Sequence, residues 1–524
     1  MTLTLKRVLW LTALAAVIIR VIYGIAFLSS ELAEFNYLDG LDMSTHLKFA
    51  NWHIIKPWSL PMFVMHRFLL FFCFIIAGNW HDPATIYTVQ ALFGVGGAVA
   101  AAWSVYLLSK NTKASLAAGL IYGFYGPFLL YESVALQESV LVHTLAMAFA
   151  LLLYFLQTKR ADAGILCGIL LGMNSAGRPA TALFALVLAL YPFYEQRKEK
   201  LQLKRFAVLF ALFGVWCAAS LFNKYYKDTF SPFFNVMPHL VEVHTSAPAA
   251  PAVQTAVQTA ETAAQNTSVL SGYFSVLWGA IKNVPLLFGM REIPENLDYD
   301  VIRGVLPILS LGPLMLMPFA AAGMITMALL RKKELLLLYV SIAVLIVPLA
   351  ARVPIGRYRL LLIPFFIIFA VLLISEMVSN QRRRLAMLGI VIGVIGCNLL
   401  CASPLVRPNP AAHHTLALAA VRRRTAAEQH LLNAWVSSNY SYKPSGLMLI
   451  VRYMKQQKYA EAEKVILESR VKSPEFLYYF ALIRTAQNRM AEAEAALRGI
   501  TSPHELGALY PKYLQLAAFI RQRR

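Results

Sequence analysis

The sequence Val8-Leu-Trp-Leu-Thr-Ala-Leu-Ala-Ala-Val-Ile-Ile-Arg20-Val-Ile-Tyr-Gly-Ile-Ala-Phe-Leu-Ser29 is apolar throughout except at Arg20. A helix needs about 20 mostly apolar residues to cross a bilayer, so this stretch is long enough to span one. Lys6 and Arg7 precede it, as in a signal sequence, but the run exceeds the apolar core of a signal peptide, roughly 7–15 residues. We therefore predict an uncleaved first span with its N-terminus in the cytoplasm.

The composition of the whole chain agrees with this first stretch. Of its 524 residues, 58% are hydrophobic and only 14% are charged, which excludes an ordinary soluble globule and predicts an all-α polytopic membrane protein. The formal net charge of +21 arises from short Lys/Arg clusters between apolar runs. Because no single face or tail collects these charges, membrane topology explains them better than nucleic-acid binding, and we expect no nucleic-acid partner.

The number of spans follows from the positions of the basic clusters. Eleven apolar runs are long enough to cross, near 8–29, 84–108, 114–131, 138–157, 161–177, 179–195, 205–224, 302–330, 334–350, 357–377 and 383–402. A further run, 60–78, would invert every later loop if it crossed, against the positive-inside rule. We therefore predict eleven transmembrane helices and an interfacial helix at 60–78 within a first periplasmic loop at 30–83.

On this topology the unusual polar residues collect on the external side, and the C-terminus is external. They are Asp39, Asp42, Glu132, Glu138, Arg178, the loop 225–301 and the stretch 351–359. A transporter would place ionisable groups at mid-membrane depth. Their position at the outer helix ends instead favours an enzyme that takes a lipid-linked substrate from the outer leaflet of the membrane.

Two regions differ in composition from the 1–402 membrane domain. Residues 246–268 of the large loop are rich in Ala, Pro, Thr and Gln and are expected to form a disordered insert. After a linker at 403–424, residues 425–524 become helical and soluble in character. There Tyr459-Ala-Glu-Ala-Glu463 recurs as Met490-Ala-Glu-Ala-Glu494, a spacing close to the tetratricopeptide repeat. Such repeats would bind a protein partner on their concave face.

Six motifs in the predicted membrane domain resemble a known superfamily. They are Leu41-Asp42-x-x-x-His46-x-x-Phe49-Ala50, Tyr87-Thr-Val-Gln90, Tyr131-Glu-x-x-Ala-Leu-Gln-Glu138-Ser139, Gly177-Arg178-Pro179, Arg291-Glu-Ile-Pro-Glu-Asn296-Leu-Asp-Tyr299 and Arg357-Tyr-Arg-x-x-x-x-Pro364. Together they resemble the bacterial GT-C glycosyltransferases related to the dolichyl-phosphate-mannose protein mannosyltransferases (glycosyltransferase family 39). Tetratricopeptide tails are familiar in that superfamily. The resemblance implies a GT-C fold and a polyprenyl-phosphate-linked sugar donor.

The resemblance implies that Asp42 is the catalytic base, which takes the proton of the incoming hydroxyl. Asp39 lies three residues earlier; it would raise the pKa of its neighbour if both share a helical face, or it caps a turn beside Gly40. His46, where relatives often have Tyr, would orient Asp42 or contact substrate. Asp42 and His46 have a spacing that suits a divalent metal, but two ligands without a third do not define a site.

Basic residues would hold the departing lipid phosphate. Arg357 and Arg359 are implied to bind it as a pair, with Tyr358 against lipid, although arginines at this depth also extend simply toward the interface. Arg178 is a similar but weaker candidate. Glu138 is placed to contact the donor sugar or a metal.

The sequence therefore predicts an inverting glycosyltransferase in a bacterial inner membrane, acting at the periplasmic face on a protein, glycan or lipid acceptor. Two alternatives remain open at this point. One is a lipid or polysaccharide transporter or flippase, which would share the span count and the charge. The other is a non-catalytic membrane scaffold that recruits partners through its repeat tail.

Overall fold

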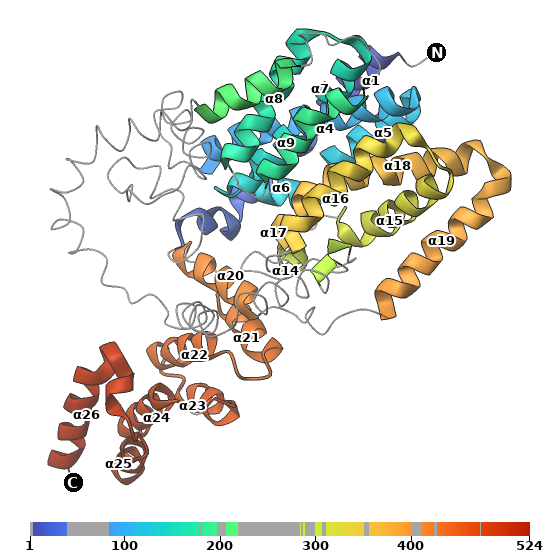
Figure 1. Ribbon diagram of the computed structural model, residues 1–524. Helices are drawn as coiled ribbons and strands as arrows, with labels where there is room; N and C mark the ends of the chain where they lie inside the picture. Colours follow the sequence, from blue (N-terminus) through green and yellow to red (C-terminus); the bar gives the residue numbers. More distant parts are fainter. Residues whose placement is uncertain are drawn as a thin grey trace, which may run out of the picture. The chain divides into compact units, whose positions relative to one another are not determined.

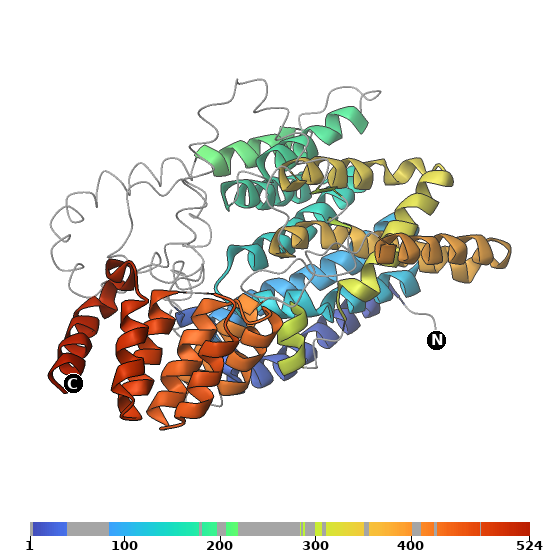
Figure 2. The same cartoon turned by 90° about the horizontal axis from the view of Figure 1, so that it is seen from below.

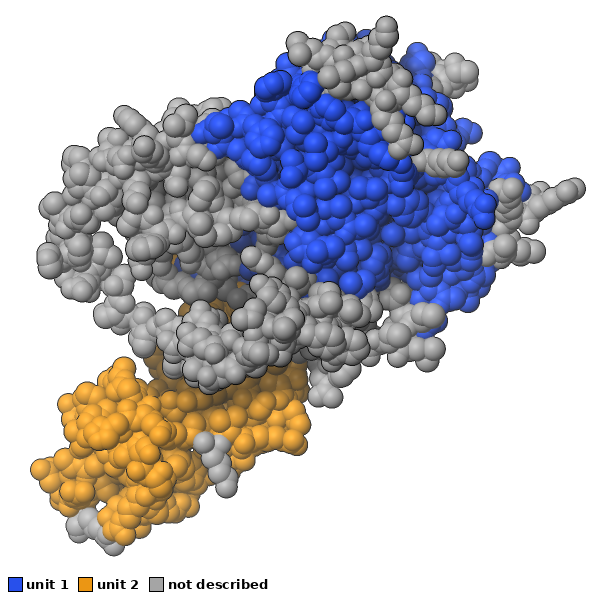
Figure 3. All heavy atoms as spheres, viewed as in Figure 1, with its two compact units in different colours: residues 1–293, 302–405 blue, residues 294–301, 406–524 orange. Residues whose placement is uncertain are grey.

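The chain forms two compact units of α-helices, which are described separately (Figure 3). The computed structural model describes residues 4–38, 83–177, 181–195, 206–217, 283–284, 287–288, 299–306, 311–350, 356–400, 410–423, 427–471 and 473–523. Unit 1 comprises Met1–Ile293 and Ile302–Leu405, and unit 2 comprises Pro294–Val301 and Val406–Arg524. Within the described ranges there is no β-strand, only an isolated bridge between Tyr125 and Leu311.

Unit 1 contains the apolar helices (Figure 1). In chain order the elements are α1 (Leu5–Ser29), η1 (Glu31–Tyr37), α4 (Pro83–Ser109), α5 (Thr112–Gly123), α6 (Gly126–Glu132), α7 (Gln137–Thr158), α8 (Ala161–Gly177), α9 (Ala182–Glu195), α14 (Tyr299–Val305), α15 (Pro313–Leu329), η6 (Lys333–Leu335), α16 (Leu336–Ala350), α17 (Gly356–Arg359), η7 (Leu360–Leu362), α18 (Ile363–Ser379) and α19 (Gln381–Leu400). The first residues of α14, up to Val301, are assigned to unit 2. A further helix covers Phe206–Cys217.

Four of the described helices are long and apolar enough to cross a membrane: Leu5–Ser29, Ala84–Ser109, Gln137–Thr158 and Arg357–Ser379. Unit 1 also contains shorter apolar helices of 10–17 residues. The prediction of an all-α polytopic membrane protein is confirmed. α1 shows the reason most clearly, because Val8, Tyr23 and Phe27 are buried against the protein while Trp10 and Ile25 are largely exposed, as expected for a lipid-facing surface.

Two predicted spans are wrong as single helices. The run 114–131 divides into α5 and α6, because the chain bends at Phe124–Tyr125 to pair with the backbone of Leu311, where Gly126 N donates to Leu311 O at 2.7 Å. Proline in the first turn of α6 suits a new helix start. The run 302–330 likewise divides into α14 and α15, and Pro313 begins α15.

Small residues allow the helices of unit 1 to approach closely. α1 packs on α4 and α5, and α15 packs on α18. A Cβ at Gly323 in α15 would lie 2.3 Å from the carbonyl oxygen of Phe369, and one at Gly119 in α5 would lie 2.4 Å from Thr12. Such close approaches of a neighbouring helix to a small residue are typical of membrane helix packing.

Unit 2 is a row of helices stacked side by side, drawn in orange and red in Figure 2. They are α20 (Pro410–Arg422), α21 (Glu428–Ser437), α22 (Lys443–Lys455), α23 (Tyr459–Glu468), α24 (Pro474–Ala486), α25 (Met490–Arg498), η9 (Pro503–Leu509) and α26 (Tyr510–Arg523). The two copies of the repeated sequence open α23 and α25. Their assignment to the tetratricopeptide class stays a prediction.

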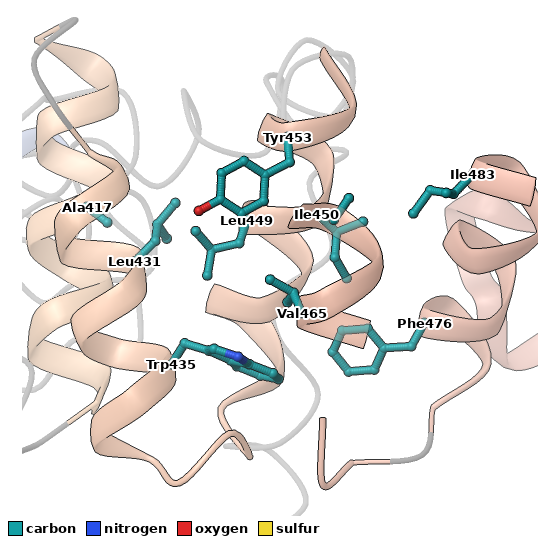
Figure 4. Close-up of a cluster of buried hydrophobic side chains, with 10 residues drawn as sticks. Ala417, Leu431, Trp435, Leu449, Ile450, Tyr453, Val465, Phe476 and Ile483 are labelled. Carbon is teal, nitrogen blue, oxygen red and sulfur yellow. The ribbon is translucent and has the colours of Figure 1, made fainter. Parts of the chain in front are cut away.

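The predicted linker at 403–424 includes a helix. It contains α20, which packs on α21 and contributes the buried Ala417 to a core with Trp435, Leu449 and Phe476 (Figure 4). α20 is short and rich in alanine, so it lacks the long apolar run by which the spans were found. The predicted interfacial helix 60–78, the insert 246–268 and most of the loop 225–301 lie outside the described residues.

Candidate active site

The structure describes half of the predicted site residues. Glu138, Arg357, Tyr358 and Arg359 are described, and they lie at the starts of two helical segments of unit 1. Asp39, Asp42, His46 and Arg178 lie outside the described residues, so their assigned roles stay predictions.

Glu138 and Arg357 come together although they belong to different motifs. Glu138 is in the first turn of α7 and is 3% exposed. The Nε atom of Arg357, in α17, lies 3.9 Å from Glu138 Oε1. The side chain of Arg357 is 19% exposed, and its guanidinium lies 5.3 Å from the centre of the Tyr358 ring. This pair therefore places a partly accessible cation beside a buried carboxylate and an aromatic ring.

Arg359 differs from Arg357 in its surroundings. It is 1% exposed and is among the largest fully buried side chains of the described residues. The buried residues of η7 and α18 follow it directly. The sequence resemblance treats the two arginines as an equivalent pair, but in this structure only Arg357 has a side chain partly accessible from outside.

The turn that leads into α7 is held by two buried side-chain amides. Asn36, in η1, donates from Nδ2 to Ser133 O at 3.2 Å and accepts from Ala135 N–H at 2.7 Å. Gln90, in α4, donates from Nε2 to Glu132 O at 3.0 Å and to Val134 O at 2.8 Å. Backbone groups at the end of α6 and in the turn that follows it therefore find partners here, as buried backbone groups require.

A second charged cluster, which sequence reasoning missed, lies on the α6 side of this turn. Arg20 Nη2 is 2.6 Å from Glu132 Oε1, and His143 Nε2 is 2.9 Å from the same oxygen. Tyr122 Oη is 2.9 Å from His143 Nδ1. All four side chains are buried. The sequence prediction named Glu132 only among the external polar residues. Arg20 was the available signal, because an arginine inside a span needs a partner.

Helix α4 accommodates this cluster through two glycines one turn apart. A Cβ at Gly94 would lie 2.2 Å from Glu132 Oε1 and 2.4 Å from Arg20 Nη2. A Cβ at Gly97 would lie 2.6 Å from the Tyr122 hydroxyl and 2.9 Å from His143 Nδ1. The charged groups thus rest directly against the α4 backbone, where any larger residue would displace them.

No group of three or more His, Cys, Asp or Glu side chains that could hold a metal ion occurs in the described part of the chain. The residues for which the sequence raised a metal, Asp42 and His46, lie outside it. Among the described residues, Glu138 therefore belongs to no such group.

The fold and the site together define the class: an all-α membrane protein with a carboxylate–guanidinium pair where two helical segments begin. No protein-family model matches the sequence, and no curated protein matches it. Among solved structures, the chain resembles the archaeal oligosaccharyltransferase AglB from Archaeoglobus fulgidus in complex with an inhibitory peptide and a dolichol-phosphate. The identity is 13% and the TM-score 0.37, over 87% of this chain and 59% of that one.

A second similar structure is the Archaeoglobus fulgidus oligosaccharyltransferase in its apo form. The identity is again 13%, with a TM-score of 0.38, over 82% of this chain and 57% of that one. This chain thus spans less than two thirds of the length of either. TM-scores of this size do not assign a fold or a function.

Proposed function

We propose that this chain is a GT-C membrane glycosyltransferase that transfers a sugar from a polyprenyl-phosphate-linked donor to an acceptor hydroxyl. The order of the six sequence motifs supports the proposal. The observation that carries it is the contact between Glu138 and Arg357, which brings two of those motifs together at 3.9 Å. A partly accessible guanidinium beside a buried carboxylate suits an anionic ligand that carries hydroxyl groups.

The proposed reaction is a single displacement at the anomeric carbon. The acceptor hydroxyl gives its proton to the carboxylate of Asp42, and its oxygen forms a bond to C1 of the donor sugar. The bond between C1 and the phosphate oxygen breaks, and its electron pair leaves with the polyprenyl phosphate. Attack from the face opposite the leaving group inverts the configuration at C1.

The charged residues at the described helix starts would act on the donor. Arg357 stabilises the negative charge that develops on the leaving phosphate. Because Arg359 is buried, we assign it an electrostatic contribution from inside the protein and give Arg357 the direct contact. Glu138 holds the guanidinium of Arg357 and accepts hydrogen bonds from sugar hydroxyls. Arg178, Asp39 and His46 keep their proposed supporting roles.

The proposed setting is a bacterial inner membrane with the site at its periplasmic face. That orientation follows from the positions of the basic clusters in the sequence. Unit 2 would then be periplasmic, where its stacked helices could bind a protein partner. The acceptor would be a protein, a glycan or a lipid that carries a free hydroxyl.

A direct experiment is to incubate purified protein in nanodiscs with polyprenyl-phosphate-linked sugars extracted from bacterial membranes. We expect release of free polyprenyl phosphate that depends on the protein and is abolished by Asp42→Asn. Arg384→Ala serves as a control. Arg384 lies near the start of α19, and the predicted topology places this helix start on the cytoplasmic side, away from the site. Undiminished release by a folded Asp42→Asn protein would refute the assignment of the base.

A transporter is the second candidate, and the buried Arg20–Glu132–His143 cluster is the observation that favours it. Titratable groups inside membrane helices often belong to ion or proton pathways. In this structure, however, their side chains are 0–3% exposed. Movement of a labelled polyprenyl phosphate across vesicles, without any sugar transfer, would favour the transporter.

A further inference from the structure

The turn Ser133–Leu136 joins α6 to α7 and is not part of either helix. Within the turn, Ser133 N–H donates to Leu130 O and Leu136 N–H donates to Val134 O. Two distant side chains, Asn36 and Gln90, add bonds to Glu132 O, Ser133 O, Val134 O and Ala135 N–H. Both amides are buried, at 0% and 1% exposure. A buried backbone group that loses its partner pays the full cost of desolvation, so this turn has one strongly favoured conformation.

Glu138 follows this turn almost immediately. α7 begins at Gln137, and Glu138 lies in its first turn. The direction in which the first turn of α7 leaves the loop therefore sets where the Glu138 carboxylate lies. That carboxylate is 3.9 Å from Arg357 Nε, so a displacement of this helix start would change the distance between the two charges, and with it their interaction.

The turn is also fixed from its other end. Glu132, its preceding residue, is tied to Arg20 and His143, and the Tyr23 hydroxyl lies 3.2 Å from Ser133 Oγ. Rotation of the turn is therefore restrained by α1, α4 and α7 together. The charged cluster anchors the turn, and the two amides define its backbone.

We propose that Asn36 and Gln90 form an amide clamp that positions Glu138 against Arg357, and that they are positioning residues for the site. The clamp acts through the backbone of residues 132–135 and does not touch the substrate. Its consequence for donor binding rests on the proposed function, whereas its consequence for the turn does not. The two consequences can therefore be measured separately.

The first measurement is hydrogen exchange of the peptide that covers the turn and the first turn of α7, in the full-length protein. Asn36→Leu removes both bonds of Asn36 with little change in size. We expect amide exchange in residues 133–138 to accelerate about tenfold or more, since a buried bond contributes roughly 0.5–1.5 kcal/mol and an unsatisfied group costs more. Gln90→Leu is the second variant, for use if Asn36→Leu does not fold.

The matched control is Asn174→Leu. Asn174 is also fully buried, and its Nδ2 donates to Thr144 Oγ1 at 2.7 Å and to Leu170 O. The control therefore removes an equivalent amide from unit 1 without touching the turn. It should leave exchange in 133–138 unchanged. Equal acceleration in both variants, or none in Asn36→Leu, would overturn the clamp.

The second measurement is equilibrium binding of undecaprenyl monophosphate to the protein in nanodiscs. Asn36→Leu should weaken binding about tenfold, and the double variant with Arg357→Ala should bind no more weakly than Arg357→Ala alone, because the clamp acts through that contact. Additive losses would show a purely structural role and overturn the positioning claim. If the wild-type protein does not bind this probe, the proposed function fails, and the exchange measurement alone decides the clamp.

Discussion

Arg20 and Glu132 form a buried ion pair, with 2.6 Å between Nη2 and Oε1 across a sequence separation of 112 residues. Arg20 Nη1 also donates to the carbonyl oxygens of Ala16 and Gly123. The pair thereby ties α1 to α5 and α6, inside the apolar part of the protein. A buried pair of this kind adds little net stability but makes the loss of either partner costly.

Removing one charge of this pair should therefore destabilise the protein strongly. Glu132→Gln leaves Arg20 as an uncompensated buried charge and should cost about 3–5 kcal/mol, measured as a lower unfolding midpoint in detergent. Asp162→Asn is the control, because its partner Arg160 is exposed, and it should change little. The double variant Arg20→Met/Glu132→Leu should recover part of the loss. Equal effects of Glu132→Gln and Asp162→Asn would contradict the description of the cluster.

A methyl group at position 94 should disturb the same cluster. The Cβ of Gly94→Ala would overlap Glu132 Oε1 and Arg20 Nη2, and we expect a loss of about 1–3 kcal/mol from overpacking. Gly393→Ala is the matched control, since nothing lies within 4 Å of a Cβ there. Alanine is also the better helix former, so the control should be neutral or slightly stabilising. A stable Gly94→Ala protein would argue against this packing of α4.

The stability of unit 2 should depend on pH through a buried histidine. Burial lowers the pKa of His414 from 6.5 to about 4. The unfolded chain therefore binds more protons than the folded one below pH 6.5, and stability is lost progressively as the pH falls from about 6.5 to 4. Burial and the nearby His430 shift the pKa of His413 in the same direction.

His414→Asn tests this dependence in the full-length chain. His414 Nδ1 lies 2.9 Å from Ser445 Oγ, and an asparagine amide can occupy a similar position without titrating. The protection of amides in α20, corrected for the intrinsic pH dependence of exchange, should fall on acidification in the wild type. It should fall less in the variant, with His413 leaving a residual dependence. The same acid response in both proteins would exclude His414 as a cause.

Sequence reasoning succeeded where structure follows from a continuous local pattern. The apolar runs around α1, α4, α7 and α18 predicted those helices, because burial in a bilayer requires an uninterrupted apolar segment. Sequence reasoning failed where residues far apart in the sequence determine the local structure or the role of a side chain. The break between α5 and α6 depends on Leu311, and the role of Glu132 depends on Arg20. For Glu138 and Arg357, the sequence predicted only that both lie on the external side of the membrane. It could not predict their contact, because the sequence at the start of one helix does not show which other helix start lies beside it.

Arg357 should dominate the affinity for the lipid phosphate. Arg357→Ala should weaken binding of undecaprenyl monophosphate roughly thirtyfold, equivalent to about 2 kcal/mol for a charge-assisted contact. Arg357→Lys keeps the charge but loses the planar guanidinium, so its affinity should lie between those of the wild type and Arg357→Ala. Binding isotherms in nanodiscs measure this series. Unchanged affinity in Arg357→Ala would remove the phosphate role from this residue.

The central claim is sugar transfer from a polyprenyl-phosphate donor with Asp42 as base. Mass spectrometry of envelope and periplasmic glycoconjugates, from cells that produce either the wild-type protein or Asp42→Asn at equal levels, tests it most directly. The account predicts a glycan mass increment on a defined acceptor with the wild type and its absence with the variant. Identical glycoconjugate profiles from the two strains would contradict it.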